Sequence, residues 1–471
     1  HPSRLLVPLT EVTHDRLSVE IMRGCTRGCR FCQAGMITRP VRSRPTDDVA
    51  RLVEEGIAGT GCDEVSLVSL SSSDYDNLPG LVERLNQTLF DRRVSVSLPS
   101  LRLDSFSLEL AKGIGAVRRA GLTFAPEAGT QRLRDVINKN ETEENLLRTV
   151  DAAFAAGWNR VKLYFMIGLP TETDEDVDAI VELVRRLRRV ARAHRRGARL
   201  SVSVSPFVPK PHTPFQWEPQ DAPSELRRKQ DFLRERLRMR GVKVSLREPE
   251  VSMLECVIAR GDRRVADVIE AAWRAGAALQ GWTEHFDAGA WRRAFEETGV
   301  APAAFAGALD PDEPLPWDHI DGGPSKAFLL RERERAFPGE TTPDCRVVGC
   351  FDCGACGPRE GVTRPMPPRR EKPRELAARE VYGRSDRRRR NGTGDAVERW
   401  RIRYRKGREV RFLSHLDIVR IFGRAVAVSE LPVAFSHGFN PHPRFSFGPP
   451  LPVGVTGEAE FVDVELVRPV G

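Results

Sequence analysis

Three cysteines lie close together near the start of the chain: Cys25, Cys29 and Cys32, in the segment RGCTRGCRFCQAG. Thiolates are the ligands that iron–sulfur clusters require, and these short spacings let one loop present several sulfurs to one cluster. Three ligands would leave one iron of a [4Fe-4S] cluster open, just as catalytic metal sites keep a coordination position free. The alternatives are a zinc site without a nearby fourth ligand, or cysteines that happen to lie in a buried turn.

A second group of four cysteines falls in the glycine-rich segment DCRVVGCFDCGACGP: Cys345, Cys350, Cys353 and Cys356. Four thiols indicate a closed metal site. Tetrahedral zinc and a second [4Fe-4S] cluster both fit, because each accepts four cysteines. The Cys-x2-Cys-x2-Cys spacing is closer to that of ferredoxins and favours iron–sulfur. Cys62 and Cys256 stand alone and are expected to be small core residues.

The elements that must position these cysteines alternate between short β-branched runs and helical stretches, which is typical of parallel βα units. We count six units, which suit an incomplete barrel. The predicted fold is therefore α/β: a partial (β/α)6 barrel, a helical, cysteine-rich extension and a small α+β C-terminal module. The predicted strands are Leu17–Met22, Glu64–Leu70, Val94–Leu98, Gly121–Ala125, Arg160–Ile167 and Arg199–Pro206.

In such a barrel, functional groups gather at the carboxyl ends of the strands. The first cysteine group follows the first strand, and the run of serines at 71–73 follows the second. Glu127 follows the fourth strand and Gly168 the fifth, while PFVPKPHTPF (206–215) lies at the end of the sixth. Gly168 would allow a close backbone approach, whereas Glu127 could equally be an ordinary loop carboxylate.

The sequence predicts five regions. They are 1–16, the remainder of an upstream segment; 17–240, the barrel; 241–357, the helical extension that ends in the four-cysteine site; 358–397, a basic linker; and 398–471, a C-terminal module that is cut short. Because the chain begins at His1 and stops just after a strand-like stretch, both ends are expected to have been cut from something longer.

Basic residues concentrate around the linker. Residues 361–410 hold 17 Lys and Arg against 7 Asp and Glu, whereas the formal net charge of the whole chain is +8. A solvated linker is the simpler interpretation, and a contact for RNA phosphates is the alternative. No apolar run reaches the roughly 18 residues of a membrane span, and the first residues do not resemble a signal peptide. We therefore expect a cytoplasmic protein with no membrane partner.

The pattern Cys25-x3-Cys29-x-Phe31-Cys32, with an aromatic residue before the last cysteine, resembles the signature of the radical S-adenosylmethionine (SAM) superfamily. The resemblance implies that the open iron binds the amino and carboxylate groups of SAM. An electron from the cluster then cleaves the sulfonium, and a 5′-deoxyadenosyl radical abstracts hydrogen from a substrate. A reductase, flavodoxin or ferredoxin would supply the electron, and Phe31 would lie against the adenine.

The same resemblance assigns further SAM contacts to the strand ends. Ser72 and Ser73 occupy the position where the superfamily normally has a Gly-Gly-Glu-like backbone edge, which is a departure from the pattern. Glu127, in APEAG, is the candidate polar contact to SAM. Gly168, in FMIGLPTET, matches the region that passes the adenine.

Longer stretches resemble an uncharacterised cobalamin-type radical SAM family that ends in a radical-SAM-linked module. They include PEAGTQRLRDVINKN, DCRVVGCFDCGACG and the terminal FLSHLD and SHGFNPHPRFSFGPPLPVG. The resemblance implies a reaction like that of a methyltransferase or methylthiotransferase, with cobalamin supplied by an upstream domain. The basic linker and the appended module favour an RNA nucleotide as substrate. The alternatives are a non-catalytic iron–sulfur electron carrier and an RNA-binding adaptor.

Three histidines of the final module, His415, His437 and His442, lie among glycines, prolines and phenylalanines. Histidines in such turn-rich segments can be catalytic, can bind metal or can contact bases. They can equally be loop residues that hydrogen-bond to neighbouring backbone, and the sequence leaves both interpretations open.

Overall fold

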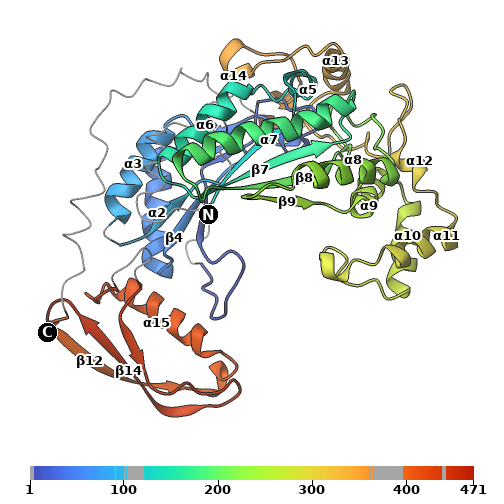
Figure 1. Cartoon of the computed structure of the whole chain (residues 1–471). Coiled ribbons are helices and arrows are strands. Elements are labelled where there is room, and N and C mark those ends of the chain that lie inside the picture. Colours follow the sequence, from blue (N-terminus) through green and yellow to red (C-terminus); the bar gives the residue numbers. More distant parts are fainter. Residues whose placement is uncertain are drawn as a thin grey trace.

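The computed structural model describes residues 5–90, 92–99, 102, 121–359, 362–364, 396–436 and 442–470. Parallel strands and helices alternate over its first half, shown from blue to green in Figure 1. The strands are β1 (Leu17–Glu20), β4 (Glu64–Val68), β5 (Ser95–Ser97), β6 (Leu122–Glu127), β7 (Arg160–Ile167), β8 (Arg199–Pro206) and β9 (Val242–Leu246). Two further short strands, β2 (Met22–Arg23) and β3 (Arg42–Ser43), pair antiparallel beside the cysteine loop.

The strands form two parallel sheets, ordered β1-β4-β5 and β6-β7-β8-β9. All six predicted strands are present, and the α/β class is confirmed. β9 is a seventh parallel strand that the sequence analysis did not include, and it pairs with β8 over five residues. Within the described residues no ladder joins β5 to β6, so the strands do not make one continuous sheet.

Helices connect successive strands and cover the sheets. They are α1 (Gln33–Ile37), α2 (Thr46–Thr60), α3 (Leu78–Leu89), α5 (Gln131–Val136), α6 (Glu143–Ala155), α7 (Asp174–His194) and α8 (Pro223–Arg236). The start of α7 has a capping box, in which Thr173 and Asp176 satisfy each other's backbone amides; this motif fixes where a helix begins. None of the described helices is long and apolar enough to cross a membrane.

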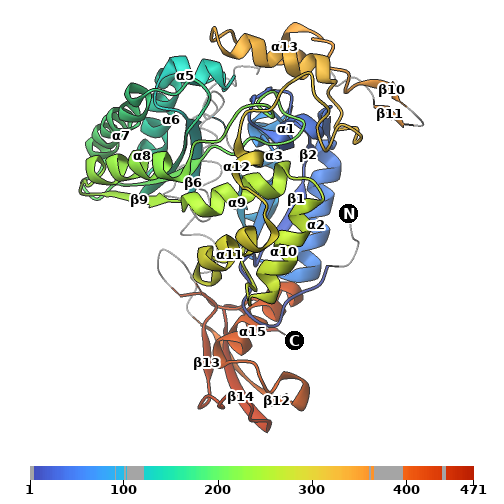
Figure 2. The same cartoon turned by 90° about the vertical axis from the view of Figure 1, so that its right-hand side faces the viewer.

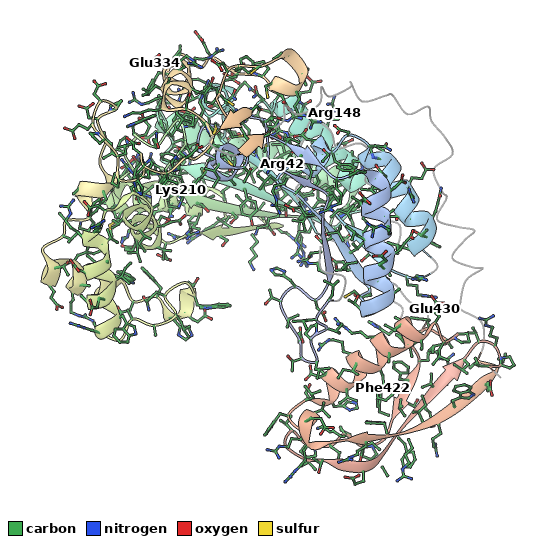
Figure 3. The ribbon with its side chains drawn as sticks, turned by 180° about the vertical axis from the view of Figure 1, so that it is seen from behind. Arg42, Arg148, Lys210, Glu334, Phe422 and Glu430 are labelled. Atoms are coloured by element: carbon green, nitrogen blue, oxygen red, sulfur yellow. The ribbon has the colours of Figure 1, made fainter. Side chains whose placement is uncertain are left out.

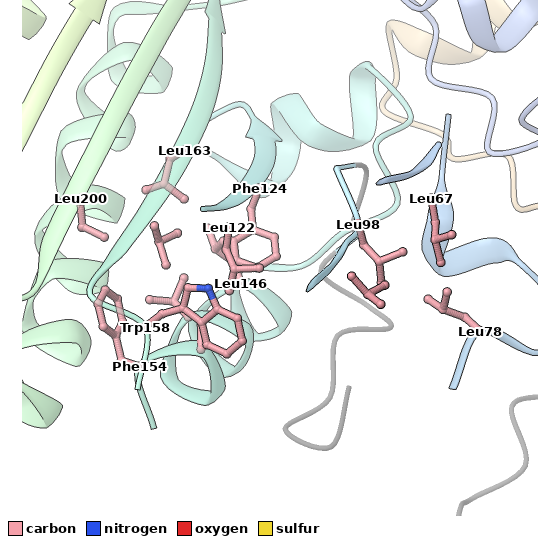
Figure 4. Close-up of a cluster of buried hydrophobic side chains, with 14 of the residues drawn as sticks. Leu67, Leu78, Leu98, Leu122, Phe124, Leu146, Phe154, Trp158, Leu163 and Leu200 are labelled. Atoms are coloured by element: carbon pink, nitrogen blue, oxygen red, sulfur yellow. The ribbon is translucent and has the colours of Figure 1, made fainter. Parts of the chain in front are cut away.

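One hydrophobic core extends through both sheets and their helices. Figure 4 shows Trp158, Phe154 and Phe124 packed between the β6–β8 strands and α6, with Leu67 and Leu98 on the neighbouring sheet. Trp158 is 3% exposed and Phe124 1%. Burying aromatic side chains of this size stabilises the fold by roughly 2–3 kcal/mol each. This core therefore fixes the positions of the strands whose carboxyl ends carry the predicted site residues.

A helical extension follows β9. It comprises α9 (Pro249–Arg260), α10 (Arg264–Arg274), α11 (Ala288–Thr298), α12 (Ala303–Ala306), α13 (Lys326–Ala336), α14 (Cys345–Val348) and the hairpin β10 (Gly357–Arg359) and β11 (Val362–Arg364). Helices α9 to α12 share a separate core that includes Trp291 and Phe295. A cavity of about 520 Å³ opens beside these two aromatic residues, and its lining contains none of the predicted site residues.

The C-terminal module is an antiparallel sheet covered by one helix. Its elements are β12 (Glu398–Lys406), α15 (His415–Ser429), β13 (Phe445–Phe447) and β14 (Gly457–Leu466), with the strands in the order β12-β14-β13. Phe422 on α15 packs against Tyr404 with ring centroids 5.0 Å apart. Figure 2 shows α15 beside the lower end of α2, and Figure 3 shows Glu430 on that side of the module, where it pairs with Arg92 at 2.7 Å.

Candidate functional site: the cysteine loop and the strand ends around it

The first three cysteines lie in the loop between β2 and α1, and Cys32 caps the helix. Its sulfur accepts a hydrogen bond from the Gly35 amide at 3.3 Å. A Cβ on Gly35 would stand 3.4 Å from that sulfur and 3.9 Å from the Cβ of Cys25, so both side chains flank the first turn of α1. Burial raises the pKa of the Cys25 thiol to about 12, and the neighbouring Cys29 thiol adds to the rise. Burial raises the pKa of Cys32 as well.

These thiols form a donor set that suits an iron–sulfur cluster. As the side chains lie, no three His, Cys, Asp or Glu residues of the described ranges are close enough to hold a metal ion. The three thiols nevertheless share one short loop and interact electrostatically. A metal binds thiolates rather than thiols. Burial disfavours the thiolates of Cys25 and Cys32, and the positive charge of a bound iron–sulfur cluster would stabilise them.

Arg30, between the second and third cysteines, fixes the loop to the rest of the protein. Its side chain is fully buried and pairs with Glu332 of α13 at 3.2 Å. It also donates to the carbonyl oxygens of Val136 at 2.9 Å and Glu340 at 2.6 Å. A buried guanidinium needs this many acceptors to offset its desolvation. The cysteine loop is therefore held between α5 and α13.

The serine segment after β4 is folded against this loop. Ser72 and Ser73 lie in a short 3-10 turn with exposed fractions of 0% and 5%. The Ser73 hydroxyl accepts a hydrogen bond from the Arg102 amide at 2.9 Å, and the Ser72 hydroxyl lies 3.0 Å from that of Ser69. The carboxylate of Asp74 binds Arg27 of the cysteine loop, with Nε 2.9 Å from Oδ2. The predicted SAM edge is thus next to the cysteines, with both hydroxyls engaged inside the protein.

Glu127, at the end of β6, faces a lysine that the sequence analysis missed. The Nζ of Lys139 lies 3.5 Å from Oε1 of Glu127, and both side chains are largely buried. Burial raises the pKa of Glu127, and Lys139 offsets only part of that rise. Burial alone would lower the pKa of Lys139, but the carboxylates of Glu127 and Glu141 and the Cys29 thiol together raise it. A buried cation therefore pairs with this carboxylate and interacts electrostatically with Cys29.

The sequence feature that could have pointed to Lys139 as a site residue is its position in the segment INKN. Asn138 and Asn140 both have φ of +53°, a left-handed conformation that asparagine tolerates better than most residues. The Asn138 side chain donates to the carbonyl oxygens of Arg27 and Gly28 at 3.3 and 3.1 Å. The turn is thus held against the cysteine loop, with Lys139 between its two asparagines.

Phe31 and the ends of β6, β7 and β8 meet in a small hydrophobic cluster. Phe31 packs against a group that contains Ala128, Leu169, Phe207 and Phe215. Ala128 follows Glu127 and Leu169 follows Gly168 in the chain. The structure therefore packs Phe31 against a cluster that contains the neighbours of Glu127 and Gly168 at the fourth- and fifth-strand ends.

Gly168 adopts a φ of +78°, which favours glycine. Its amide donates to the carboxylate of Glu172 at 2.7 Å. Glu172 in turn pairs with Lys229 at 2.8 Å, and Lys229 with Asp221 at 2.7 Å. The conformation of this turn is thus set by a partly buried network of charges within the chain.

Replacing Gly168 with alanine should destabilise the protein by about 1–3 kcal/mol. The new Cβ would stand 3.0 Å from Asp221 Oδ2 in a left-handed backbone. The measurement is the change in unfolding free energy in urea. Gly59→Ala is the matched control, because its Cβ would meet nothing within 4 Å in the last turn of α2, and that change should stabilise slightly. Equal effects of the two changes would contradict the prediction.

The four-cysteine segment begins with Cys345 at the start of α14. Burial raises the pKa of this thiol to about 11, and the nearby Cys353 and Cys356 thiols contribute. The carbonyl of Cys353 accepts from the Ser325 amide at 2.9 Å. Cys350 is exposed, and its sulfur accepts from the Asp352 amide at 3.2 Å. The Cys353 and Cys356 thiols thus lie close enough to Cys345 to influence its charge, although no three of the described side chains are close enough to hold a metal ion, and Cys350 lies at the surface.

The two described histidines of the final module, His415 and His442, lie in different surroundings. His415 begins α15, and its ring packs edge-on against Phe447 with centroids 5.2 Å apart. His442 is exposed, and its amide donates to the hydroxyl of Ser436 at 3.0 Å. His437 lies outside the described residues, as does most of the predicted basic linker.

The arginines that point outward from β12 are paired with acidic residues of β14. Arg399 pairs with Glu465 at 2.8 Å, Arg401 with Asp463 at 2.8 Å, and Arg405 with Glu458 at 3.3 Å. Cross-strand pairs of opposite charge are a common stabilising arrangement in sheets. This part of the basic excess is therefore largely neutralised within the module.

Comparisons with known proteins agree with the cysteine motif. The model of the radical SAM superfamily matches residues 19–184, and a family described as an uncharacterized protein conserved in bacteria matches residues 399–471. An uncharacterized protein of Methanocaldococcus jannaschii, MJ0966, is 35% identical over 54% of this chain and 53% of its own length.

Two relatives with assigned activities match a shorter part. The tRNA-2-methylthio-N(6)-dimethylallyladenosine synthase of Opitutus terrae is 31% identical over 35% of this chain and 37% of its own length. The ribosomal protein uS12 methylthiotransferase RimO of Thermosipho africanus is 25% identical over 36% and 41%. The chain thus spans about half or less of the length of these curated relatives.

Among solved structures, the cobalamin-dependent SAM radical enzyme OxsB matches 57% of this chain and 44% of its own, with 12% identity and a TM-score of 0.36. The radical SAM methyltransferase TsrM of Kitasatospora setae matches 40% and 36%, with 17% identity and a TM-score of 0.35. The cysteine motif, the parallel α/β fold and the match of the family model together show that residues 19–184 form a radical SAM domain.

Proposed function

We propose that this protein cleaves SAM reductively and uses the product to modify a substrate held above the strand ends. When bound by Cys25, Cys29 and Cys32, a [4Fe-4S] cluster supplies the electron for that cleavage. The observation that carries the proposal is the convergence on the cysteine loop of Asp74 after β4 and Glu127 at the end of β6. A protein that only carries electrons does not need charged side chains from several strand ends around its cluster.

The chain's own residues suit the binding of SAM. Lys139 offers a buried ammonium near Cys29, and Glu127 offers a carboxylate beside it. These two charges complement the carboxylate and the amino group of an amino acid, and buried charged partners give the strongest hydrogen bonds. Phe31 adds a partly buried aromatic ring from the cysteine loop, and such a ring suits an adenine. The main-chain edge at Ser72 and Ser73 would complete the site, because their hydroxyls are already engaged.

Anaerobic incubation of the iron-loaded protein with SAM and dithionite tests this function. We expect 5′-deoxyadenosine if hydrogen is abstracted, and S-adenosylhomocysteine as well if a methyl group is transferred. A flavodoxin or ferredoxin with its reductase should replace dithionite. Formation of neither product would support the non-catalytic iron–sulfur protein instead.

Replacing Lys139 with methionine should weaken SAM binding about 10- to 100-fold, because a hydrogen bond to a charged group contributes roughly 1.5–3 kcal/mol. Lys139→Arg should retain most of the affinity because it keeps the charge. The dissociation constant is measured by equilibrium dialysis of the iron-loaded protein. Lys243→Met removes an exposed lysine on β9 and serves as the control. Unchanged binding in Lys139→Met would exclude this residue from the site.

For the substrate, we propose an RNA nucleotide that receives a methyl or methylthio group. Two observations support this choice: a relative that is named as a tRNA methylthio synthase, and the basic composition of residues 361–410. The test supplies SAM carrying a labelled methyl group to the enzyme with total tRNA, ribosomal RNA and ribosomal proteins. Label in a nucleoside supports the proposal, whereas label only in protein contradicts it. Cobalamin, proposed from the sequence resemblance, should then be required for methyl transfer to carbon.

For the four-cysteine site, we propose a second [4Fe-4S] cluster. The support is the donor set: four thiols lie on one glycine-rich segment, and Cys353 and Cys356 influence the charge of Cys345. The chain purified without oxygen should then hold about eight irons. About four irons and one zinc would show that the second site is structural zinc instead.

A further inference from the structure

Cys345 stands between Arg346, which contacts the segment of the predicted SAM edge, and Asp344, which contacts the first cysteine loop. On its C-terminal side, Arg346 has a fully buried side chain that donates to the carbonyl oxygen of Asp74 at 3.2 Å and pairs with the carboxylate of Asp76. On its N-terminal side, Asp344 lies 3.7 Å from Nε of Arg27. A ligand of the second metal site is thus flanked by two direct contacts to the first site.

These contacts continue to the cysteine loop. Arg27, which lies between Cys25 and Cys29, binds the carboxylate of Asp74 through both Nε and Nη2. The side chains of Arg27, Asp74 and Asp344 are 12%, 6% and 4% exposed. Charge pairs at such burial are costly to break, because one partner is left without compensation. The four-cysteine segment, the SAM edge and the first cysteine loop therefore share one ion-pair network.

Among the described residues, hydrophobic packing contributes little to holding α14 in place. The helix has four residues, far fewer than a helix needs to be stable by itself. Val347 and Val348 are both 55% exposed, so they contribute little burial. Gly349 follows with a φ of +120°. A metal bound through Cys345 would supply the constraint that hydrophobic packing does not.

We infer that the metal of the four-cysteine site positions the SAM-binding edge, by holding Asp344 and Arg346 against Arg27 and Asp74. Asp344 and Arg346 are positioning residues, because they act on SAM only through the edge. The inference rests on the proposed function for its SAM readout. The coupling between the two segments can also be measured without SAM.

The test compares variants of the full chain by two readouts. One is the SAM affinity, followed as the change that SAM makes in the electron paramagnetic resonance spectrum of the reduced first cluster. The other is hydrogen exchange of the backbone amides of residues 72–76. Cys353→Ser should lose the second metal, bind SAM about tenfold more weakly and exchange faster in that segment. Cys62→Ser, which removes a buried thiol elsewhere, should match the wild type in both readouts.

A second pair of variants separates the contacts from the metal. Arg346→Lys should keep the second metal but show the same two defects, because lysine cannot reach the Asp74 carbonyl and Asp76 together. Asp76→Asn changes the partner whose side chain is 45% exposed, and should show a smaller defect in a chain that folds normally.

The outcomes distinguish the two proposals. If Cys353→Ser loses its metal yet keeps wild-type exchange in 72–76 and wild-type SAM affinity, the coupling is overturned. It is also overturned if Arg346→Lys is impaired while Cys353→Ser is not. If the wild type binds no SAM, the proposed function fails, and the exchange measurement alone decides the coupling.

Discussion

Replacing Cys29 with alanine is expected to abolish SAM cleavage, with 5′-deoxyadenosine falling to the level formed without enzyme. Two thiolates cannot hold a cluster that requires three protein ligands from this loop. Cys29 is the most informative of the three, because its thiol interacts with Cys25, with Cys32 and with the buried Lys139. The measurements are the iron content, the spectrum of the reduced cluster and the 5′-deoxyadenosine formed.

The control is Cys256→Ala, which removes a buried thiol from the helical extension and should leave cleavage unchanged. Circular dichroism should show the same fold in both variants, since the Cys29 side chain belongs to no hydrophobic core cluster of the described residues. A Cys29→Ala protein that still cleaves SAM would remove the three-cysteine loop from the mechanism altogether.

The strand pattern of the first half could be predicted because each strand carries its own signal. β7 and β8 are eight-residue runs in which every second residue is buried. Gly168 follows β7 directly, and a proline-rich segment follows β8. β9 was missed although its sequence VKVSL alternates apolar and polar residues, because the run is only five residues long. None of the five is fully buried, and pairing with β8 places the strand in the sheet.

The candidate site was predictable only as far as its parts follow strands. Cys25, Glu127 and Gly168 could be named from the order of motifs along the chain. The contacts that assemble them join distant segments: Arg346 reaches Asp74 over 272 positions, and Asn138 reaches Thr342 over 204. No local periodicity of the sequence predicts such pairs, because each partner lies in a segment that reads as an ordinary turn by itself. Lys139 was missed for this reason, since its role depends on burial.

The number of basic residues in a segment indicated RNA binding less well than the positions of their acidic partners do. The arginines of β12 contribute to the basic excess of residues 361–410, yet Arg401 and Arg399 face carboxylates of β14 more than sixty positions later. Exposed ion pairs of this kind add little stability, but they do reduce the positive field available to a phosphate backbone. Within the described residues, the C-terminal sheet therefore adds little to the case for RNA.

Replacing Arg30 with methionine should destabilise the protein by about 3–5 kcal/mol, the usual result of removing one partner from a buried ion pair. The change leaves the carboxylate of Glu332, which is 4% exposed, with the Thr342 hydroxyl at 2.8 Å as its remaining hydrogen-bond partner among the described residues. It also removes the donors to the carbonyls of Val136 and Glu340. Urea unfolding measures the loss, and Arg51→Met, which breaks an exposed pair with Glu55, should cost less than about 1 kcal/mol.

A double-mutant cycle separates the ion pair from the backbone contacts. Glu332→Leu in the Arg30→Met background removes the stranded carboxylate, so the double variant should be more stable than Arg30→Met alone. It should not regain wild-type stability, because the two carbonyl oxygens still lack the donors that Arg30 supplied. Additive losses would show that the two side chains are not coupled. Full recovery would show that Arg30 contributes through its charge alone, and that the cysteine loop does not depend on its hydrogen bonds to α5 and to the turn after α13.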